Sequence, residues 1–340
     1  MKTIVFFNQA AGDIIHILKI YDQLMSSAID YTFKIVCFNN ERICEVYKTL
    51  HLNNVDVSFF PHIYPSFKNP FSRMQWRKKV SMALEKIITD RNAEIYFTSI
   101  YDDFMTPYYV GILAEKGHRI YYLNHYDDCQ NIFPIKNSSL KKRLILSILN
   151  YNTGIRYSMC NMSGRWIVFR YPKEIIPHMT ELHPVLDTAI CKKYAVKIDS
   201  NFNKTALLFT QPNRDHQLIS NEEHDEMQRS VAKKLKDAGY TLALKGHPTI
   251  GICEAVRPYA DVIVPQIIPG ELLDFSQIHS CYAFLSIALA STAKLGIRSY
   301  SFLPLMKSHE SVNYQEALSF ITETGEGKIL LLSSLNEIDR

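Results

Sequence analysis

Short apolar runs alternate with amphipathic segments along the first 124 residues of this chain. The apolar runs predict strands at 3–7, 33–38, 55–60, 95–98 and 120–124. Helices are expected between them, at 14–25, 41–50, 77–89 and 107–116, because apolar residues such as Ile14, Ile17, Leu18 and Tyr21 recur at helical spacing. This rhythm predicts a doubly wound parallel sheet built from β-α-β units.

The pattern loosens after residue 140, where the breakers Pro172, Pro177 and Pro184 interrupt it. It resumes with predicted strands at 205–210, 241–245, 262–264, 280–285 and 298–302, and with helices at 221–238, 270–275 and 288–295. The sequence therefore predicts an α/β chain with two Rossmann-like domains that face a central cleft. We expect the boundaries 1–185, followed by a linker to about 204, and 205–340.

Composition agrees with a folded, two-domain protein. The chain has 340 residues, of which 47% are hydrophobic and 21% charged, which argues against a disordered protein. Its seven cysteines include no Cys-x-x-Cys pair, so we expect a reducing, cytoplasmic setting and neither a disulfide framework nor a zinc site. The early polar turn after Phe7 argues against a signal peptide, and no run of about 18 apolar residues predicts a membrane span.

The formal net charge is only +4, but basic residues concentrate at 68–79 and 136–143. Mixed with apolar and aromatic residues, they suit the anionic inner face of a membrane, on which the protein would be peripheral. The alternative is a solvated helix start with a packed Trp76. The basic excess is too small to favour nucleic-acid binding.

Chemically capable residues follow three predicted strands of the second half. They lie in Lys245-Gly246-His247-Pro248, in Pro269-Gly270-Glu271, and at Ser286 with Ser291 and Thr292 one turn later. Open α/β sheets bind ligands at the carboxyl ends of their strands, where a His can donate a proton, a Glu can hold ribose hydroxyls and a Ser can cradle a phosphate. Each also has an ordinary alternative: a packed His, a helix-capping Glu and a Ser N-cap.

The ordered series of His-Pro, Pro-x-Glu and Ser resembles the nucleotide-sugar half of the bacterial sialyltransferases that cap lipooligosaccharides and O-antigens, and of the related polysialyltransferases. The resemblance implies the GT-B glycosyltransferase architecture and metal-independent, inverting transfer of N-acetylneuraminate from CMP-N-acetylneuraminate (CMP-Neu5Ac). The acceptor would be a terminal galactose or similar sugar on a lipid-linked surface glycan. The family's catalytic His would be His247. The implied donor-binding residues are Lys245, Gly246, Pro248, Pro269, Glu271, Ser286, Ser291 and Thr292.

The same resemblance calls for an acidic pair that deprotonates the acceptor hydroxyl. Asp127 and Asp128 follow the predicted strand 120–124, with Cys129 where the family has Gly, and we favour Asp127 as the base. The other candidates are Asp102, Asp103, Asp215 and Asp225. The loop after the first strand, with Gln9, Gly12 and Asp13, is expected to contact the acceptor.

Two other functions fit the same residues. A glycosyltransferase with CMP-Kdo or a nucleotide diphosphate sugar as donor would keep much of the second half. A non-catalytic nucleotide-sugar-binding protein would keep Glu271 and Ser286 but would need neither His247 nor the acidic pair. No metal or other cofactor is expected beside the donor, and a homodimer is compatible with the sequence.

Overall fold

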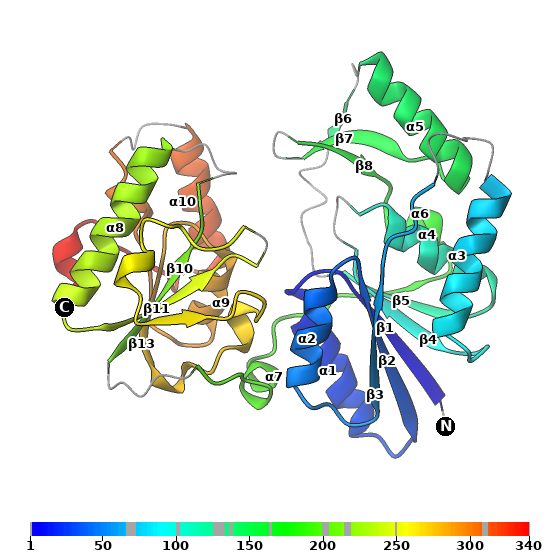
Figure 1. The fold of residues 1–340 in the computed structure, drawn as a ribbon, viewed down its shortest axis with the longest axis horizontal. Coiled ribbons are helices and arrows are strands. Elements are labelled where there is room, and N and C mark those ends of the chain that lie inside the picture. The colour runs from blue at the N-terminus through cyan, green and yellow to red at the C-terminus, as the bar shows by residue number, and fades with distance from the viewer. Residues whose placement is uncertain are drawn as a thin grey trace. The chain divides into compact units, whose positions relative to one another are not determined.

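The apolar runs become the strands of two parallel, six-stranded sheets, one in each of two compact units (Figure 1). The first unit is Met1–Val185 and the second is Leu186–Arg340. The computed structural model describes residues 2–65, 73–99, 103–124, 133–135, 139–162, 165–198, 204–213, 219–248, 250–307 and 312–339.

In the first unit the strand order is β3-β2-β1-β4-β5-β9, and every neighbouring pair is parallel. The strands are β1 (Lys2–Asn8), β2 (Tyr31–Phe38), β3 (Val55–Phe60), β4 (Glu94–Phe97), β5 (Arg119–Leu123) and β9 (Thr180–Leu182). The main helices are α1 (Asp13–Met25), α2 (Glu41–Thr49), α3 (Arg73–Ile87) and α4 (Met105–Glu115).

Strand β1 lies at the centre of this sheet and is buried on both faces. Val5 and Phe7 belong to a core that also contains Trp76 of α3 and Tyr108 of α4. Successive side chains of a strand point to opposite faces, so the fully buried Phe6 packs on the other side. This explains why the central strands are continuous apolar runs rather than alternating ones.

The segment after residue 139, where the sequence pattern loosens, is more ordered than expected. It contains α5 (Leu140–Thr153), α6 (Pro172–Ile175) and the strands β7 (Ser158–Met162) and β8 (Arg165–Phe169), which form a small antiparallel sheet with the preceding β6 (Phe133–Pro134). Figure 1 shows this sheet and α5 together at one end of the unit. The chain then returns to the main sheet as β9, whose three residues are too few for a periodic signal.

The second unit repeats the arrangement with the order β12-β11-β10-β13-β14-β15, again all parallel. Its strands are β10 (Thr205–Thr210), β11 (Thr241–Gly246), β12 (Val262–Val264), β13 (Ile278–Ala283), β14 (Ser299–Ser301) and β15 (Leu330–Leu331). Its α-helices are α7 (Thr188–Lys193), α8 (Asn221–Asp237), α9 (Ile287–Lys294) and α10 (Val312–Thr324).

Numbered within each unit, both sheets have the strand order 3-2-1-4-5-6 of the Rossmann fold. The prediction of an α/β chain with two Rossmann-like domains is therefore confirmed. The expected linker before residue 204 contains α7 and a β-bridge from Val196 to Leu273, both within the second unit. The helix predicted at 270–275 is wrong, because the chain makes short 3-10 turns at Gly270–Leu272 and Phe275–Gln277.

Among the described residues, no helix is long and apolar enough to cross a membrane.

Candidate functional site

In a sheet of Rossmann order, the strand order reverses at a switch point between the first and fourth strands, and ligands bind at the carboxyl ends of the strands there. The switch points of this chain are β1/β4 in the first unit and β10/β13 in the second. Most of the described candidate residues lie in loops or helix starts that follow these strands or their neighbours.

Lys245 lies at the end of β11 and is only 3% exposed. Its ammonium donates hydrogen bonds to the carbonyl oxygens of Gly246, at 2.8 Å, and Gln266, at 2.9 Å. Burial lowers the pKa of Lys245 to about 8, although the nearby Glu271 carboxylate favours the charged form. The lysine therefore joins the end of β11 to the segment after β12 and adds positive charge beneath it.

Glu271 lies in the 3-10 turn at Gly270–Leu272, and its carboxylate is joined to α9. The Ser291 hydroxyl of that helix donates to Glu271 Oε1 at 3.1 Å. Gly270 lets the turn come this close, because a Cβ at that position would lie 2.9 Å from the Ala288 Cβ and 3.1 Å from Phe209 Cε1. The glycine of Pro269-Gly270-Glu271 is thus required by packing against α9.

His247 is exposed on a tight turn directly after β11. Its backbone N–H and carbonyl each pair with Gly251 at 3.0 Å, and its Nδ1 accepts the Ile250 N–H at 3.4 Å. The amide of Gln266 donates to the carbonyls of both His247 and Pro248, each at 2.8 Å. The backbone of the turn is therefore fixed, and it presents an exposed His247 at the edge of the sheet.

The three remaining donor-binding candidates occupy different environments. Ser286 is the N-cap residue of α9, and its side chain makes no capping hydrogen bond, so its hydroxyl is available to a ligand. Thr292 is fully buried, and its hydroxyl bonds to the Leu289 carbonyl and to Ser299 at 2.8 Å. Pro269 is buried directly before the 3-10 turn. The structure thus joins Lys245, Glu271 and Ser291 and leaves Thr292 in the core.

In the first unit, Asp13 supports the loop after β1. It is fully buried, and its Oδ2 accepts hydrogen bonds from the N–H groups of Gln9 and Ala10, at 3.1 and 2.9 Å, and from the Thr98 hydroxyl at 2.7 Å. Asp13 therefore stabilises the conformation of the loop after β1 and links it to the end of β4. Gly12, beside it, is exposed.

The side chain of Gln9 donates to Asp103, which lies just before α4. Asp103 Oδ1 also accepts the Met105 N–H at 2.7 Å, and Oδ2 accepts the Thr106 hydroxyl at 2.6 Å. Burial raises the pKa of Asp103, while His62 and these hydrogen bonds lower it. Gln9 and Asp103 thus join the ends of β1 and β4, at the switch point of this sheet.

His62 is a residue that the sequence analysis missed. It follows β3, and its Nδ1 lies 3.9 Å from Asp103 Oδ1. Burial lowers the pKa of His62, although Asp103 favours the protonated form, so the ring is neutral at neutral pH and can accept a proton. The available signal was its position, two residues after the predicted strand 55–60, at the same edge as Gln9.

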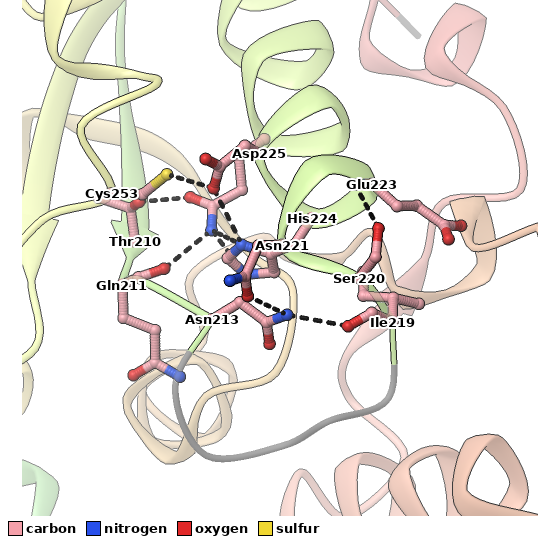
Figure 2. Close-up of polar contacts among 11 residues, drawn as sticks. Thr210, Gln211, Asn213, Ile219, Ser220, Asn221, Glu223, His224, Asp225 and Cys253 are labelled. Atoms are coloured by element: carbon pink, nitrogen blue, oxygen red, sulfur yellow. Dashed lines mark hydrogen bonds and ion pairs between the residues drawn. The ribbon is translucent and has the colours of Figure 1, made fainter.

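Four acidic candidates, Asp102, Asp127, Asp128 and Asp215, lie outside the described residues. Asp225 is described and lies in the first turns of α8, beside His224 (Figure 2). His224 is 2% exposed, and its ring contacts the amide of Gln228, which also bonds Thr210 and the Gln211 carbonyl at the end of β10. This group therefore lies at the carboxyl edge of the second sheet.

The first unit also contains a cavity of about 620 Å³ at the opposite edge of its sheet. The lining includes Arg119 and Thr180, the first residues of β5 and β9, together with Arg73 and Arg77 of α3. Arg77 is ion-paired with Glu115 in the same wall. The charged part of this lining is therefore mainly cationic, with Arg73, Arg77 and Arg119 beside Glu115.

No family model and no curated protein matches this sequence. Solved structures with a similar arrangement include UDP-GlcNAc 2-epimerase from Methanocaldococcus jannaschii, at 11% identity and a TM-score of 0.49 over 99% of this chain and 90% of that chain. UGT2 of Phytolacca americana, complexed with UDP-2fluoro-glucose and pterostilbene, is 11% identical with a TM-score of 0.45, over 100% of this chain and 89% of that chain. The E. coli heptosyltransferase WaaC, with ADP-2-deoxy-2-fluoro heptose, is 11% identical with a TM-score of 0.44, over 99% of this chain and 96% of that chain.

Proposed function

We propose that this chain is a glycosyltransferase that binds a nucleotide-sugar donor at the carboxyl edge of its second sheet. The observation that carries the proposal is the convergence at that edge of the segments that follow β11, β12 and β13. Lys245 joins the end of β11 to the segment after β12, and Ser291 of α9, which follows β13, holds Glu271 of that same segment after β12. Such an edge combines a carboxylate for ribose, the hydroxyl of Ser286 and an imidazole on a fixed turn, which are groups that can bind a nucleotide and its sugar.

Glu271 is the proposed ribose-binding residue. Ser291 bonds its Oε1, so the carboxylate is oriented before a ligand arrives. Its other oxygen can accept hydrogen bonds from the two ribose hydroxyls. Ser286, at the N-cap of α9, is the proposed phosphate contact, since its hydroxyl is available and the free N–H groups of the helix start favour an anion.

His247 is the proposed donor to the leaving phosphate. Charge builds on the phosphate as the bond to the sugar breaks, so a donor already in place stabilises the transition state more than the bound substrate. The structure supports this role because Gln266 fixes the turn while the ring stays exposed. The acceptor oxygen would attack the anomeric carbon from the opposite face, with inversion.

The proposed donor is CMP-Neu5Ac, and the proposed acceptor is a terminal galactose or similar sugar of a lipid-linked surface glycan. This choice rests on the ordered series His247-Pro248, Pro269-Gly270-Glu271 and Ser286 in the sequence. Since CMP carries one phosphate, His247, Ser286 and backbone N–H groups suffice to neutralise it, and no metal on the donor is required. Asp127 remains the proposed base.

Thermal stabilisation by nucleotides tests the donor. A ligand that binds only the folded state raises its melting temperature, so CMP should stabilise the protein more than UDP, GDP or ADP at equal concentration. A larger shift with UDP would replace CMP-Neu5Ac by a diphosphate donor. Transfer from CMP-Neu5Ac to a galactose-terminated acceptor in excess EDTA then tests the reaction, and hydrolysis without transfer to any acceptor would contradict it.

Helices α3 and α5 supply the proposed contact with the membrane that holds the acceptor. Helix α3 carries five cationic residues and one Glu, and α5 carries three and no acid, so together they have a net charge of +7, whereas the whole chain has +4. Leu140, Leu144 and Tyr151 are 85%, 60% and 50% exposed and recur at helical spacing on α5. Trp76 takes no part, because it is buried and stacked on Tyr108.

Vesicle flotation tests this surface independently of the reaction. The protein should float with vesicles that contain phosphatidylglycerol and should stay behind with pure phosphatidylcholine. Replacing Leu140 and Leu144 by Ser should weaken flotation and leave transfer to a soluble acceptor unchanged. Val185→Ser, at a comparably exposed apolar position elsewhere, should change neither flotation nor transfer. Equal flotation of all variants would reject this surface.

A further inference from the structure

Three metal-binding side chains of different types meet in the second unit, although no motif in the sequence pairs them. His224 and Asp225 lie in the first turns of α8, and Cys253 lies in the loop after β11 (Figure 2). One ligand atom from each lies within 4.8 Å of the other two. His224 and Cys253 are both 2% exposed, so two of the three are held in the core.

The distances between these atoms fit a tetrahedral metal. Cys253 Sγ lies 3.2 Å from Asp225 Oδ1, and His224 Nδ1 lies 3.6 Å from the same oxygen. With metal–ligand bonds of about 2.0–2.3 Å, two corners of a tetrahedron are about 3.3–3.6 Å apart. The two measured edges are therefore close to those of a formed site, and small side-chain shifts would complete it.

The geometry points to a site for one Zn²⁺ ion, bound by His224 Nδ1, Asp225 and the Cys253 thiolate. A nitrogen, an oxygen and a sulfur ligand together favour zinc over magnesium or calcium, which prefer oxygen alone. The Asp225 side chain is 44% exposed, which gives the ion an entry path and leaves a water as the fourth ligand. The thiol proton, now donated to Asp225, leaves to solvent when Sγ binds the metal.

The surroundings provide the support that such ligands need. The amide of Gln228, itself bonded to Thr210 and to the Gln211 carbonyl, lies 2.9 Å from His224 Nε2 and so fixes the ring while Nδ1 lies near Asp225. Phe284 packs edge-on against the same ring at 5.5 Å between centroids. The metal would join α8 to the loop that begins at His247, and so stabilise the turn proposed to act on the donor.

Zinc titration of the full chain, stripped with a chelator, tests this site. We expect one equivalent of Zn²⁺ to bind and the melting temperature to rise with zinc concentration. Asp225→Asn and Cys253→Ser change little in size, and each should weaken zinc binding by more than about tenfold. Cys160→Ser, at a buried cysteine of the first unit, is the matched control and should bind zinc as the wild type does.

Substitution by cobalt(II) gives a second test, because its absorption spectrum reports directly whether a thiolate binds the metal. The wild type and Cys160→Ser should show thiolate-to-cobalt charge-transfer absorption, and Cys253→Ser should lack it. If wild-type protein binds zinc no better than the Asp225 and Cys253 variants, or cobalt gives no such absorption, the cluster is a hydrogen-bond network and the inference is wrong. Stabilisation by CMP is measured separately, so failure here leaves the donor proposal standing.

Discussion

The Ser291 hydroxyl donates to Glu271 Oε1 at 3.1 Å and so joins helix α9 to the 3-10 turn before β13. These residues are twenty positions apart, and the turn can approach the helix only because residue 270 has no Cβ. The contact holds a carboxylate at the sheet edge in one orientation, before any ligand is present. Such preorganisation lowers the cost of binding.

The first prediction follows from this contact. Glu271→Gln should weaken CMP binding about tenfold or more, because a neutral amide is a poorer acceptor for the two ribose hydroxyls. Ser291→Ala should weaken it less, since the carboxylate remains but loses its orientation. Calorimetric titration with CMP measures both, and Glu254→Gln, at an exposed acid of the same unit, is the control. Unchanged affinity in Glu271→Gln would place the ribose elsewhere.

The second prediction concerns the turn that carries His247. His247→Ala should reduce turnover on the order of a hundredfold, as expected for a lost charge-stabilising donor, with the fold intact. Gln266→Ala should cause a smaller loss of kcat, because it frees the His247 and Pro248 carbonyls but keeps the imidazole. Single-turnover kinetics separates the chemical step from binding. Near-normal turnover in His247→Ala would assign this residue a structural role.

The third prediction is a pH dependence of stability. Burial lowers the pKa of Lys245 from its ordinary 10.5 to about 8, so between these values the unfolded chain binds more protons than the folded one. The charged lysine therefore lowers the free energy of unfolding most below pH 8, and this loss of stability disappears as pH rises toward 10.5. The pKa difference corresponds to a change of roughly 3 kcal/mol in the free energy of unfolding, as an upper limit.

Lys245→Met removes this titration. Urea unfolding at pH 7.5 and at pH 9.5 should show the wild type gaining stability relative to Lys245→Met at the higher pH. Lys233→Met, which removes an exposed charge of α8, is the matched control. A stability difference that stays constant across this range would mean that Lys245 does not titrate there.

The fourth prediction separates the candidate bases. Asp127→Asn should abolish transfer while CMP binding stays close to that of the wild type, because the acceptor and the nucleotide are assigned to different units. Asp128→Asn should be milder, and His62→Gln and Asp103→Asn should keep transfer. Slow hydrolysis of CMP-Neu5Ac, measured beside transfer, monitors donor activation. Loss of transfer in His62→Gln alone would assign the base to His62, oriented by Asp103.

Five strands of each sheet could be predicted from the sequence with small shifts, whereas the short edge strands β9 and β15 were missed. Three strands, at 55–60, 205–210 and 262–264, have the predicted bounds, because short runs of mainly apolar and β-branched residues between turn signals determine local structure directly. The helix predicted at 270–275 failed because a proline and a glycine precede Glu271 and the turn is fixed by packing on α9. Local propensity contains no information about that contact.

The sequence by itself determined the class of each unit and the loops that carry chemistry, because parallel β-α-β order puts every strand's carboxyl end at one edge. Tertiary structure decided which side chains meet there. It joined Ser291 to Glu271 and buried Thr292, although the sequence offered no means of assigning different roles to the adjacent Ser291 and Thr292. It also brought His62 to Asp103 and Cys253 to Asp225 across forty-one and twenty-eight positions, because contacts between loops depend on how strands are ordered in the sheet rather than on spacing along the chain.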